Sequence, residues 1–493
     1  MIRKKRLQFF FLALFSFFFY LLFQHVDFQG YEDETFHRIR DNLQSREFKA
    51  SRCGYGQILL ETPFVYLGEK INTLLDGEKE KYLKFFTLAY NPFITALTVG
   101  IAFLLFTLFL KDLPALILTV AYAFATMTFP YAVIGMEPTS VFFIATAIYF
   151  LFRFGRTQKK IDIFLCGTFF FALLFSKSYY FITGPAFAFY IFLLFYSPQK
   201  FQFKKFLQSM LLLFSPLIIF IPLYLLGNNV SYGGYLKSPY VLQNELFGGE
   251  PFIFGLYGLL LSFGKSFFIY NPILFLTLFF FRGFYQKQRK EAIFIVLYSS
   301  LLLLFVSNVH WWSDETWGPR YLISLCLVWA IPLIAVFQAN RWDNNKFRYV
   351  FFGLIIFSFL FQLLGASARY GIFPRTMKDL FHQTGHNTLT SGEYQYVPTF
   401  APYWVNFRLI KNTVLNRKDP LNFRLIYSPP MEQNAEGKNI VKDITYKPPR
   451  ETSVLDFWWR QPKNNKPLYF SILAGFVLIF LALYHFGRKL FRS

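Results

Sequence analysis

Residues 1–23 read MIRKKRLQFFFLALFSFFFYLLF, which places four basic residues, at positions 3–6, before a strongly apolar stretch over 7–23. Signal peptides and first transmembrane helices share this order of charge and hydrophobicity. The residues that follow, QHVD at 24–27, provide no A-x-A-like cleavage site. We therefore expect an uncleaved transmembrane helix in this stretch.

The composition extends this prediction to the whole chain. Of 493 residues, 55% are hydrophobic, including 71 Phe and 31 Tyr, and only 16% are charged, which gives a mean hydropathy of +0.36. A soluble chain could not cover apolar runs such as 101–110 and 351–364 with so little polar surface. We expect an all-α integral membrane protein with several spans.

Twelve segments are predicted to cross the membrane, the shorter ones with aromatic ends in the interface. They lie near residues 7–23, 83–110, 113–129, 139–152, 161–176, 179–196, 206–226, 267–281, 291–307, 320–338, 349–367 and 468–487. Threaded alternately, their connections give one face 22 basic residues against four acids. The positive-inside rule assigns that face to the cytoplasm, together with both termini.

The opposite, external face receives the long connecting segments 24–82, 227–266, 308–319 and 368–467. We expect a catalytic core over 1–367, an external loop or small domain over 368–467, and a last helix with a basic tail over 468–493. The net charge of +22 would indicate a nucleic-acid partner in a soluble chain. Here membrane topology explains the charge, so we expect membrane lipids and no nucleic acid as partners.

The first external segment begins with three carboxylates, Glu32, Asp33 and Glu34. Adjacent carboxylates repel, and near a low-dielectric boundary the pKa of one is raised, which suits a general base or a metal ligand. The alternative is a solvated acidic turn or a helix start. Glu137, in an apolar external turn, presents a similar choice between a substrate-binding group in a polar cavity and an acid at a helix N-terminus.

The external segment HWWSDETWGPRY, at 310–321, has the highest density of polar types in an apolar context. Trp faces stack on sugars, Arg binds phosphate through two hydrogen bonds, and His or Asp moves protons. An aromatic belt with a snorkelling Arg is the alternative. The density of polar side chains favours a binding site, with candidate residues His310, Trp311, Asp314, Arg320 and Tyr321.

Lys177 and Lys265 stand at the same predicted outer boundary, each as a snorkelling lysine or as a ligand for an anion. The sequence GKS at 264–266 is not a P-loop, because the position of that motif's first glycine holds Leu259. No ATP site is expected. The six histidines and three cysteines form no HExxH motif, no CxxC pair and no credible metal-binding set.

An enzyme with an external site has no nucleotide supply, so a group transfer there needs a lipid-carried donor. Short motifs follow one another on the predicted external side and at the adjoining helix ends: Asp33-Glu34 with Phe36, GYGQ at 54–57, PFVYLG at 63–68, NP at 91–92, 131–138, GLYGLL at 255–260, WGPRYL at 317–322 and, later, DFWW at 456–459. In their order and common side they resemble the C-type (GT-C) membrane glycosyltransferases. The closest likeness is to the bacterial branch related to protein O-mannosyltransferases and the lipid A aminoarabinose transferase, over residues 1 to about 370.

The resemblance implies the GT-C fold and an inverting transfer of a sugar from a polyprenyl-phosphate donor. The acceptor would be a glycolipid, polysaccharide or protein outside the bacterial cytoplasmic membrane. Asp33 would be the catalytic base, with Glu34 as neighbour or substitute, although the acidic triplet leaves open which acid serves. Arg320 first, and Lys265 or Lys177 second, would hold the lipid phosphate. The acids permit a divalent cation, Mg²⁺ or Mn²⁺, without requiring one.

Other functions stay open at this point. An O-antigen polymerase or ligase would share a large external loop, but we would expect its arginines within that loop and no acid pair after the first helix. A transporter or lipid flippase would show inverted repeats, broken helices and ionisable groups near the membrane midplane. A scaffold without activity is also open. The gathering of ionisable groups at one interface favours the glycosyltransferase.

Overall fold

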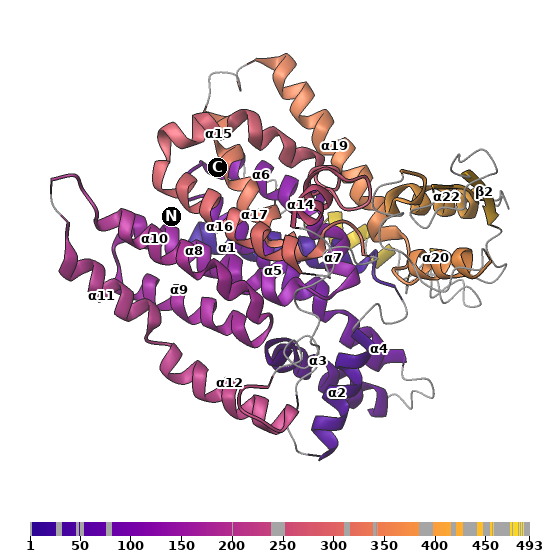
Figure 1. Ribbon diagram of the computed structural model, residues 1–493, viewed down its shortest axis with the longest axis horizontal. Coiled ribbons are helices and arrows are strands. Elements are labelled where there is room, and N and C mark those ends of the chain that lie inside the picture. The colour runs from indigo at the N-terminus through magenta and orange to yellow at the C-terminus, as the bar shows by residue number, and fades with distance from the viewer. Residues whose placement is uncertain are drawn as a thin grey trace, which may run out of the picture.

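The computed structural model describes residues 2–25, 32–45, 49, 54–74, 81–199, 201–237, 252–309, 316–338, 342, 344–383, 398–415, 421–426, 441–446, 454–455, 457 and most of 474–487. This part of the chain is built mainly from helices, with one antiparallel pair of strands. The predicted helical, membrane-type architecture is confirmed in this coarse sense (Figure 1).

Three groups of elements make up the described chain. The N-terminal segment contains α2 (Glu32–Ser45), α3 (Gly54–Leu74) and α4 (Lys81–Leu88). The bundle contains α1 (Ile2–Leu21), α5 (Tyr90–Phe106), α6 (Asp112–Phe124), α7 (Thr128–Ile134), α8 (Pro138–Thr157), α9 (Lys160–Ala172), η1 (Leu173–Phe175), η2 (Ser178–Thr183), α10 (Gly184–Phe195), α11 (Phe203–Phe214), α12 (Leu217–Tyr232), α14 (Phe252–Leu261), η3 (Pro272–Phe275), α15 (Leu276–Lys287), α16 (Arg289–Asn308), η5 (Arg320–Leu322), α17 (Ser324–Ala330), η6 (Ile331–Leu333), α18 (Ile334–Gln338) and α19 (Asn345–Ser367). The third group contains α20 (Ile372–Gln383), η8 (Pro398–Phe400), α22 (Pro402–Val414), β1 (Leu421–Ile426) and β2 (Val441–Tyr446).

Six helices in the described residues are long and apolar enough to cross a membrane. They are Leu83–Phe106, Pro138–Thr157, Ser178–Phe195, Phe203–Tyr232, Arg289–Asn308 and Asn345–Ser367. A seventh span results if α6 and α7, which meet at a bend of 50°, are counted together. Other predicted segments are helical but short, such as α9, or contain a 3₁₀ turn, such as η6 within Ser324–Gln338.

The bend between α6 and α7 has an identifiable cause in the tertiary structure. Oδ1 of Asn271 accepts a hydrogen bond of 2.8 Å from the backbone N–H of Met127, which lies in the break. Nδ2 of Asn271 donates to the carbonyl of Phe267 at 2.8 Å, so the amide is held from both sides. Capture of a backbone donor by a side chain interrupts the helical ladder and allows a kink.

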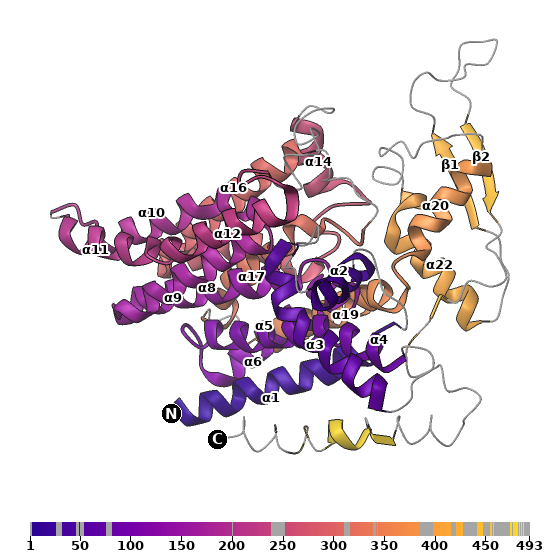
Figure 2. The same ribbon diagram turned by 90° about the horizontal axis from the view of Figure 1, so that it is seen from below.

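Aromatic side chains form much of the bundle interior. Tyr20, Tyr122, Tyr131 and Tyr298 are fully buried, and the Tyr20 hydroxyl donates 2.9 Å to the carbonyl of Ala123. Such a partner offsets the free-energy cost of removing the Tyr20 hydroxyl from water. In Figure 2 the long helices of the bundle run in one general direction, with α1 alongside α5.

The N-terminal segment α2–α4 has a small apolar core of its own, formed by Phe36, Ile39, Ile58, Val65 and Leu83. It joins the bundle where the first turns of α3 meet the chain after η1. Gly54 and Gly56 leave no room for a Cβ against the backbone of Phe175 and the hydroxyl of Ser176. These glycines therefore allow α3 to approach the residue that precedes Lys177.

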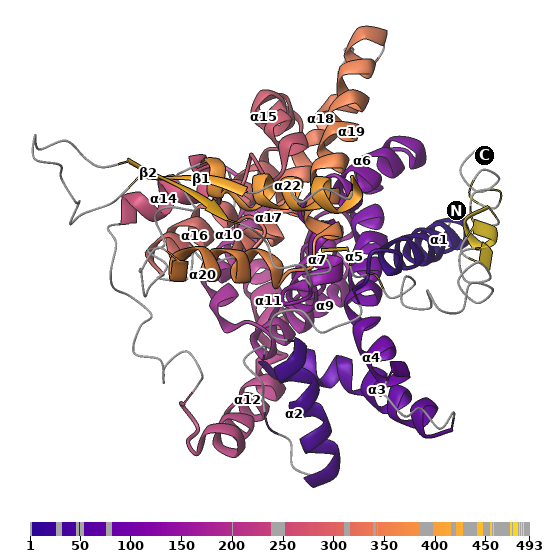
Figure 3. The same ribbon diagram turned by 90° about the vertical axis from the view of Figure 1, so that its right-hand side faces the viewer.

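The group α20–β2 lies at one end of the bundle (Figures 1 and 3). α22 packs on α19 through the rings of Tyr403 and Phe361, whose centroids are 5.4 Å apart. The strands pair in antiparallel register from Leu421 opposite Tyr446 to Ile426 opposite Val441. The described part of 368–467 thus contains secondary structure of its own beside the spans.

Candidate functional site

The segment Thr316–Leu322 is the centre of the candidate site and runs from an irregular stretch into η5. Gly318 adopts a positive φ of +62°, and a Cβ at this position would collide with Met127 and the ring of Tyr270. Only glycine satisfies both the backbone conformation and the space. The segment therefore passes closely over the α6–α7 bend.

Three consecutive carbonyls of this segment accept hydrogen bonds from side chains of other elements. Nζ of Lys265 donates to the carbonyls of Thr316 and Gly318, both at 3.0 Å, and to the Thr316 hydroxyl at 3.2 Å. The Tyr131 hydroxyl donates to the carbonyl of Trp317 at 2.9 Å. Buried carbonyls need such partners, so these side chains fix the path of the segment.

Arg320 follows directly and is buried, with 6% of its surface exposed. Its Nη1 lies 2.8 Å from Sδ of Met136, and its Nη2 donates 2.5 Å to the hydroxyl of Tyr321. Met136 has a positive φ of 74°, an unusual conformation for a residue with a side chain. Backbone strain of this kind concentrates at functional sites. Here the strained residue lies in the turn before α8, and its thioether contacts the Arg320 guanidinium.

Glu137, next to Met136, and Lys177 form a buried ion pair with 3.6 Å between Oε1 and Nζ. Glu137 precedes the first turn of α8, but its side chain accepts no capping hydrogen bond from that turn. Lys177 is 8% exposed and does not extend to solvent as a snorkelling lysine would. Tyr179, two residues on, packs edge-on against Tyr321 at 5.9 Å, which joins the pair to the Arg320 segment.

The structure thus brings together five of the residues that the sequence singles out: Glu137, Lys177, Lys265, Arg320 and Tyr321. Among the described residues this cluster contains three cations and one carboxylate, all at least nine-tenths buried. In a low-dielectric site such cations interact strongly with an anion. Phosphate, with several acceptor oxygens, is the ligand class that Arg and Lys hold best.

Most of the other predicted site residues lie wholly or partly outside the described part of the structure. Asp33 and Glu34 lie in the first turn of α2, and the Asp33 side chain lies outside the described part of the structure. His310, Trp311 and Asp314 also lie outside the described residues. Within the described part, no group of three His, Cys, Asp or Glu side chains is arranged to hold a metal ion.

Glu61, on α3, is a buried acid that the sequence analysis missed. It is 1% exposed, and its Oε2 accepts a hydrogen bond of 3.0 Å from Nε2 of Gln57. Burial raises the pKa of Glu61 to about 8, although the Gln57 hydrogen bond acts in the opposite direction. The i, i+4 spacing of Gln57 and Glu61 within the apolar first half of α3 was the available signal.

Glu61 lies on the side of α3 that packs within the N-terminal segment. Ile58 and Val65, three residues before and four residues after it, share its helix face and belong to the apolar core of α2–α4. Gly56, five residues before Glu61, touches Ser176, the neighbour of Lys177, from another face of the helix. Glu61 therefore stands on the helix that joins the N-terminal segment to the bundle, on the face toward its own small core.

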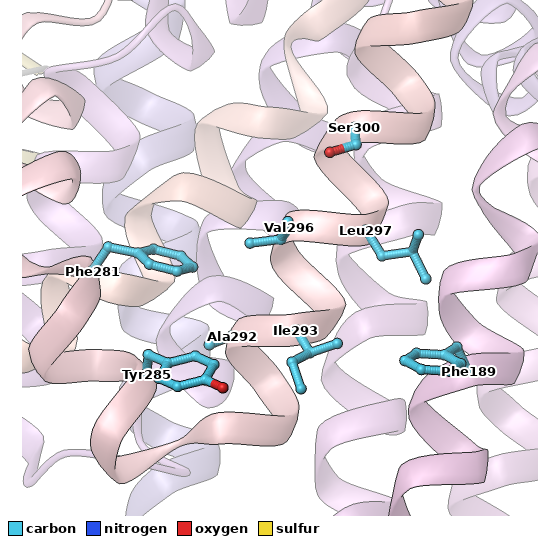
Figure 4. A pocket seen from close by; sticks show the side chains of 8 residues that line it. All are labelled: Phe189, Phe281, Tyr285, Ala292, Ile293, Val296, Leu297 and Ser300. Atoms are coloured by element: carbon cyan, nitrogen blue, oxygen red, sulfur yellow. The ribbon is translucent and has the colours of Figure 1, made fainter.

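A separate apolar groove of about 600 Å³ runs along α16 between α10 and α15 (Figure 4). Its lining is Phe189, Phe281, Tyr285, Ala292, Ile293, Val296, Leu297 and Ser300. The groove offers almost no polar atoms, so it suits a hydrocarbon chain and not a sugar or phosphate. It lies toward the start of α16, whereas the cationic cluster lies beyond the end of that helix.

Comparison with the models of known protein families and with the curated proteins gives no match for this chain.

Proposed function

We propose that the protein is a membrane glycosyltransferase of the GT-C type that transfers a sugar from a polyprenyl-phosphate donor. The observation that carries the proposal is the buried cluster of Lys177, Lys265 and Arg320 with Glu137. A lipid-linked sugar presents a phosphate at the end of an apolar chain. A cationic site at the ends of apolar helices has the matching chemistry.

In the proposed reaction the acceptor is a glycolipid, polysaccharide or protein hydroxyl outside the bacterial cytoplasmic membrane. Asp33, or its neighbour Glu34, removes the proton from this hydroxyl, whose oxygen then attacks the anomeric carbon. The bond from that carbon to the phosphate oxygen breaks, the centre is inverted, and Arg320 and Lys177 stabilise the leaving polyprenyl phosphate. The proposed topology has twelve spans, both termini in the cytoplasm and the site on the external face.

The position of the cluster along the spans favours a transferase over a transporter. Glu137 immediately precedes the candidate span Pro138–Thr157, Lys177 immediately precedes the candidate span Ser178–Phe195, and Arg320 lies four residues before the shorter apolar helix Ser324–Gln338. All three side chains therefore stand at helix starts and not at midspan. Transporters and flippases place their ionisable groups near the membrane midplane.

A transfer assay in membranes tests the proposal. Membranes with the wild-type chain receive polyprenyl-phosphate donors with a radiolabelled sugar, and label is counted in lipid, polysaccharide and protein fractions. Arg320→Ala and Asp33→Asn are each expected to lower transfer about 100-fold or more, because each removes a group that acts in the transition state. Arg282→Ala, at an exposed position on α15, is the matched control and should transfer like wild type.

The fraction that becomes labelled would identify the acceptor class. Equal transfer by wild type and Arg320→Ala, at equal protein levels, would contradict the phosphate-binding role of the cluster. If the wild type transfers no sugar from any donor, while it moves labelled lipid between leaflets, the transporter alternative replaces the proposal.

A further inference from the structure

Lys265 has an environment unlike that of the other two cations in the cluster. It is fully buried, and among the described residues its Nζ donates to the carbonyls of Thr316 and Gly318 at 3.0 Å and to the Thr316 hydroxyl at 3.2 Å. An ammonium group has three N–H donors, and these three oxygens are enough to engage all of them. A substrate phosphate could bind Lys265 only if the ammonium group left at least one of these oxygens.

The backbone around Lys265 is itself held in place. The Lys265 N–H donates to Oγ of Ser262 at 3.1 Å, and that hydroxyl donates to the carbonyl of Gly258 at 2.7 Å. The Ser266 hydroxyl donates to the carbonyl of Leu260 at 2.5 Å. The turn after α14 is thus tied to its helix, so the ammonium group projects from a fixed base.

The Gly318 carbonyl links this ammonium group to Arg320. It accepts from Nζ of Lys265 at 3.0 Å and also from the backbone N–H of Arg320 at 3.1 Å. The Arg320 backbone and the Lys265 charge thus share one acceptor. Movement of Gly318 would shift the start of η5 and with it the guanidinium that lies against Met136.

We propose that Lys265 is a positioning residue, an internal ammonium ion that holds the Thr316 and Gly318 carbonyls and thereby aims Arg320 at the donor phosphate. The expected effect of Lys265 on sugar transfer rests on the proposed function. The hydrogen bonds by which Lys265 fixes the segment 316–318 do not depend on it. This role differs from the direct phosphate contact that the GT-C resemblance implies for Lys265. The Lys265 ammonium group, whose donors are engaged by the segment 316–318, still attracts an anionic donor through its charge. Through its hydrogen bonds it holds that segment in one conformation.

Two substitutions with opposite steric effects test the proposal in the full-length protein in lipid nanodiscs. Lys265→Ala leaves an oxygen-lined space of the size of a small alkylammonium ion, whereas Lys265→Met fills that space with an uncharged chain. Hydrogen–deuterium exchange of peptides over 316–323 reports the segment, because the amides of Arg320, Leu322 and Ile323 are hydrogen-bonded within it. Sugar transfer and donor KM are measured on the same preparations.

Both substitutions are expected to speed exchange in 316–323 and to lower transfer about 100-fold, since a displacement of about 1 Å at a reacting group has that effect. Methylammonium should restore slow exchange, and at least about a tenth of the transfer, to Lys265→Ala only. Thr316→Val removes one acceptor and keeps the lysine, and it should speed exchange by a smaller factor. If neither Lys265 variant folds, Thr316→Val still tests whether loss of a Lys265 hydrogen bond loosens the segment 316–323.

Unchanged exchange in both variants, together with a raised donor KM, would overturn the proposal and assign Lys265 to the phosphate. Equal rescue of Lys265→Ala and Lys265→Met by methylammonium would also overturn it, because no space for the ion exists in the latter. If wild type transfers no sugar, the proposed function fails, while exchange and its rescue still decide the positioning role.

Discussion

Glu61 is a buried acid on the helix that joins the N-terminal segment to the bundle. Its carboxyl is buried on α3, outside the candidate spans, and burial raises its pKa to about 8. At neutral pH it is therefore mostly a neutral acid that can donate a hydrogen bond. A neutral carboxyl group suits this side of α3, where Ile58 and Val65 belong to an apolar core and a carboxylate would be costly to bury.

Glu61→Gln tests whether the Glu61 carboxyl is protonated at neutral pH. Glutamine has nearly the shape of the protonated carboxyl group but does not titrate. A pKa raised from 4.5 to about 8 means that the folded state holds the proton more tightly than the unfolded state. The Glu61 contribution is full below about pH 4.5 and is lost as pH rises to about 8, at about 1.4 kcal/mol per pH unit. Thermal unfolding in detergent from pH 5 to 9 should give the wild type a steeper loss of stability than Glu61→Gln. Parallel curves would contradict the raised pKa.

Single residues of the cluster could be predicted from the sequence, but their contacts could not. Arg320 and Lys177 stand out because charge is rare in apolar surroundings. The partner of Lys177, Glu137, is 40 residues away and meets it only through tertiary packing. The partners of Lys265 are backbone carbonyls, which every residue has, so no side-chain pattern could identify them.

At the scale of elements, α19 supports the site by packing a glycine against an indole. Gly365 leaves no room for a Cβ against the ring of Trp317, whose Nε1 donates 3.2 Å to Oε1 of Gln362 on the same helix. The segment that carries Arg320 is therefore held by α19 as well as by Lys265. Close approach of a helix to a ring depends on the absent Cβ.

Gly365→Ala is expected to destabilise the protein by about 1–3 kcal/mol, because an added methyl group in a packed interface forces neighbouring groups apart. Transfer should fall as well, since Trp317 is three residues from Arg320. Gly353→Ala is a control in the same helix, where a Cβ would meet nothing within 4 Å. It should be neutral or stabilising by up to about 1 kcal/mol. Equal thermal unfolding of both variants would show that α19 does not press on the segment.

The positions of long helices could be predicted from the sequence, but the bends and breaks within the predicted spans could not. Segments such as 139–152 and 349–367 coincide with the helices Pro138–Thr157 and Asn345–Ser367, because long apolar runs between polar turns determine them. The segment 113–129 was predicted as one span, yet it bends by 50° before α7. Asn271, which bonds to Met127 at this bend, is 144 residues further along the chain. Local periodicity contains no information about such a partner.

At the scale of the whole molecule, three acids of the predicted cytoplasmic face contact side chains of other helices, while the fourth, Asp343, lies outside the described residues. Asp112 pairs with Lys4 at 3.6 Å, Asp162 pairs with Arg153 at 3.4 Å, and the Tyr190 hydroxyl donates 3.1 Å to Glu291. Through Asp112 and Glu291, segments distant in sequence thus meet at the end of the bundle opposite to α20–β2 (Figure 2). Because the excess of basic residues gathers at that end, we propose that it faces the cytoplasm.

Cysteine labelling tests this orientation with two exposed positions at opposite ends. The background chain carries Cys53→Ser and keeps Cys166 and Cys326, which are buried. In spheroplasts, a membrane-impermeant maleimide should label Lys411→Cys on α22 at once, because the proposed external face carries it. Arg282→Cys on α15 should react only after the membrane is permeabilised.

The reverse pattern would place the cationic cluster on the cytoplasmic side, where nucleotide sugars are available, and would remove the reason for a lipid-linked donor. Labelling of both positions from outside would contradict the separation of the two ends and the positive-inside assignment together. The measurement therefore bears on the class of donor as well as on topology. A cluster on the proposed external face has no supply of nucleotide sugars, so we expect its donor sugar to be carried on a lipid, and a polyprenyl phosphate is such a carrier.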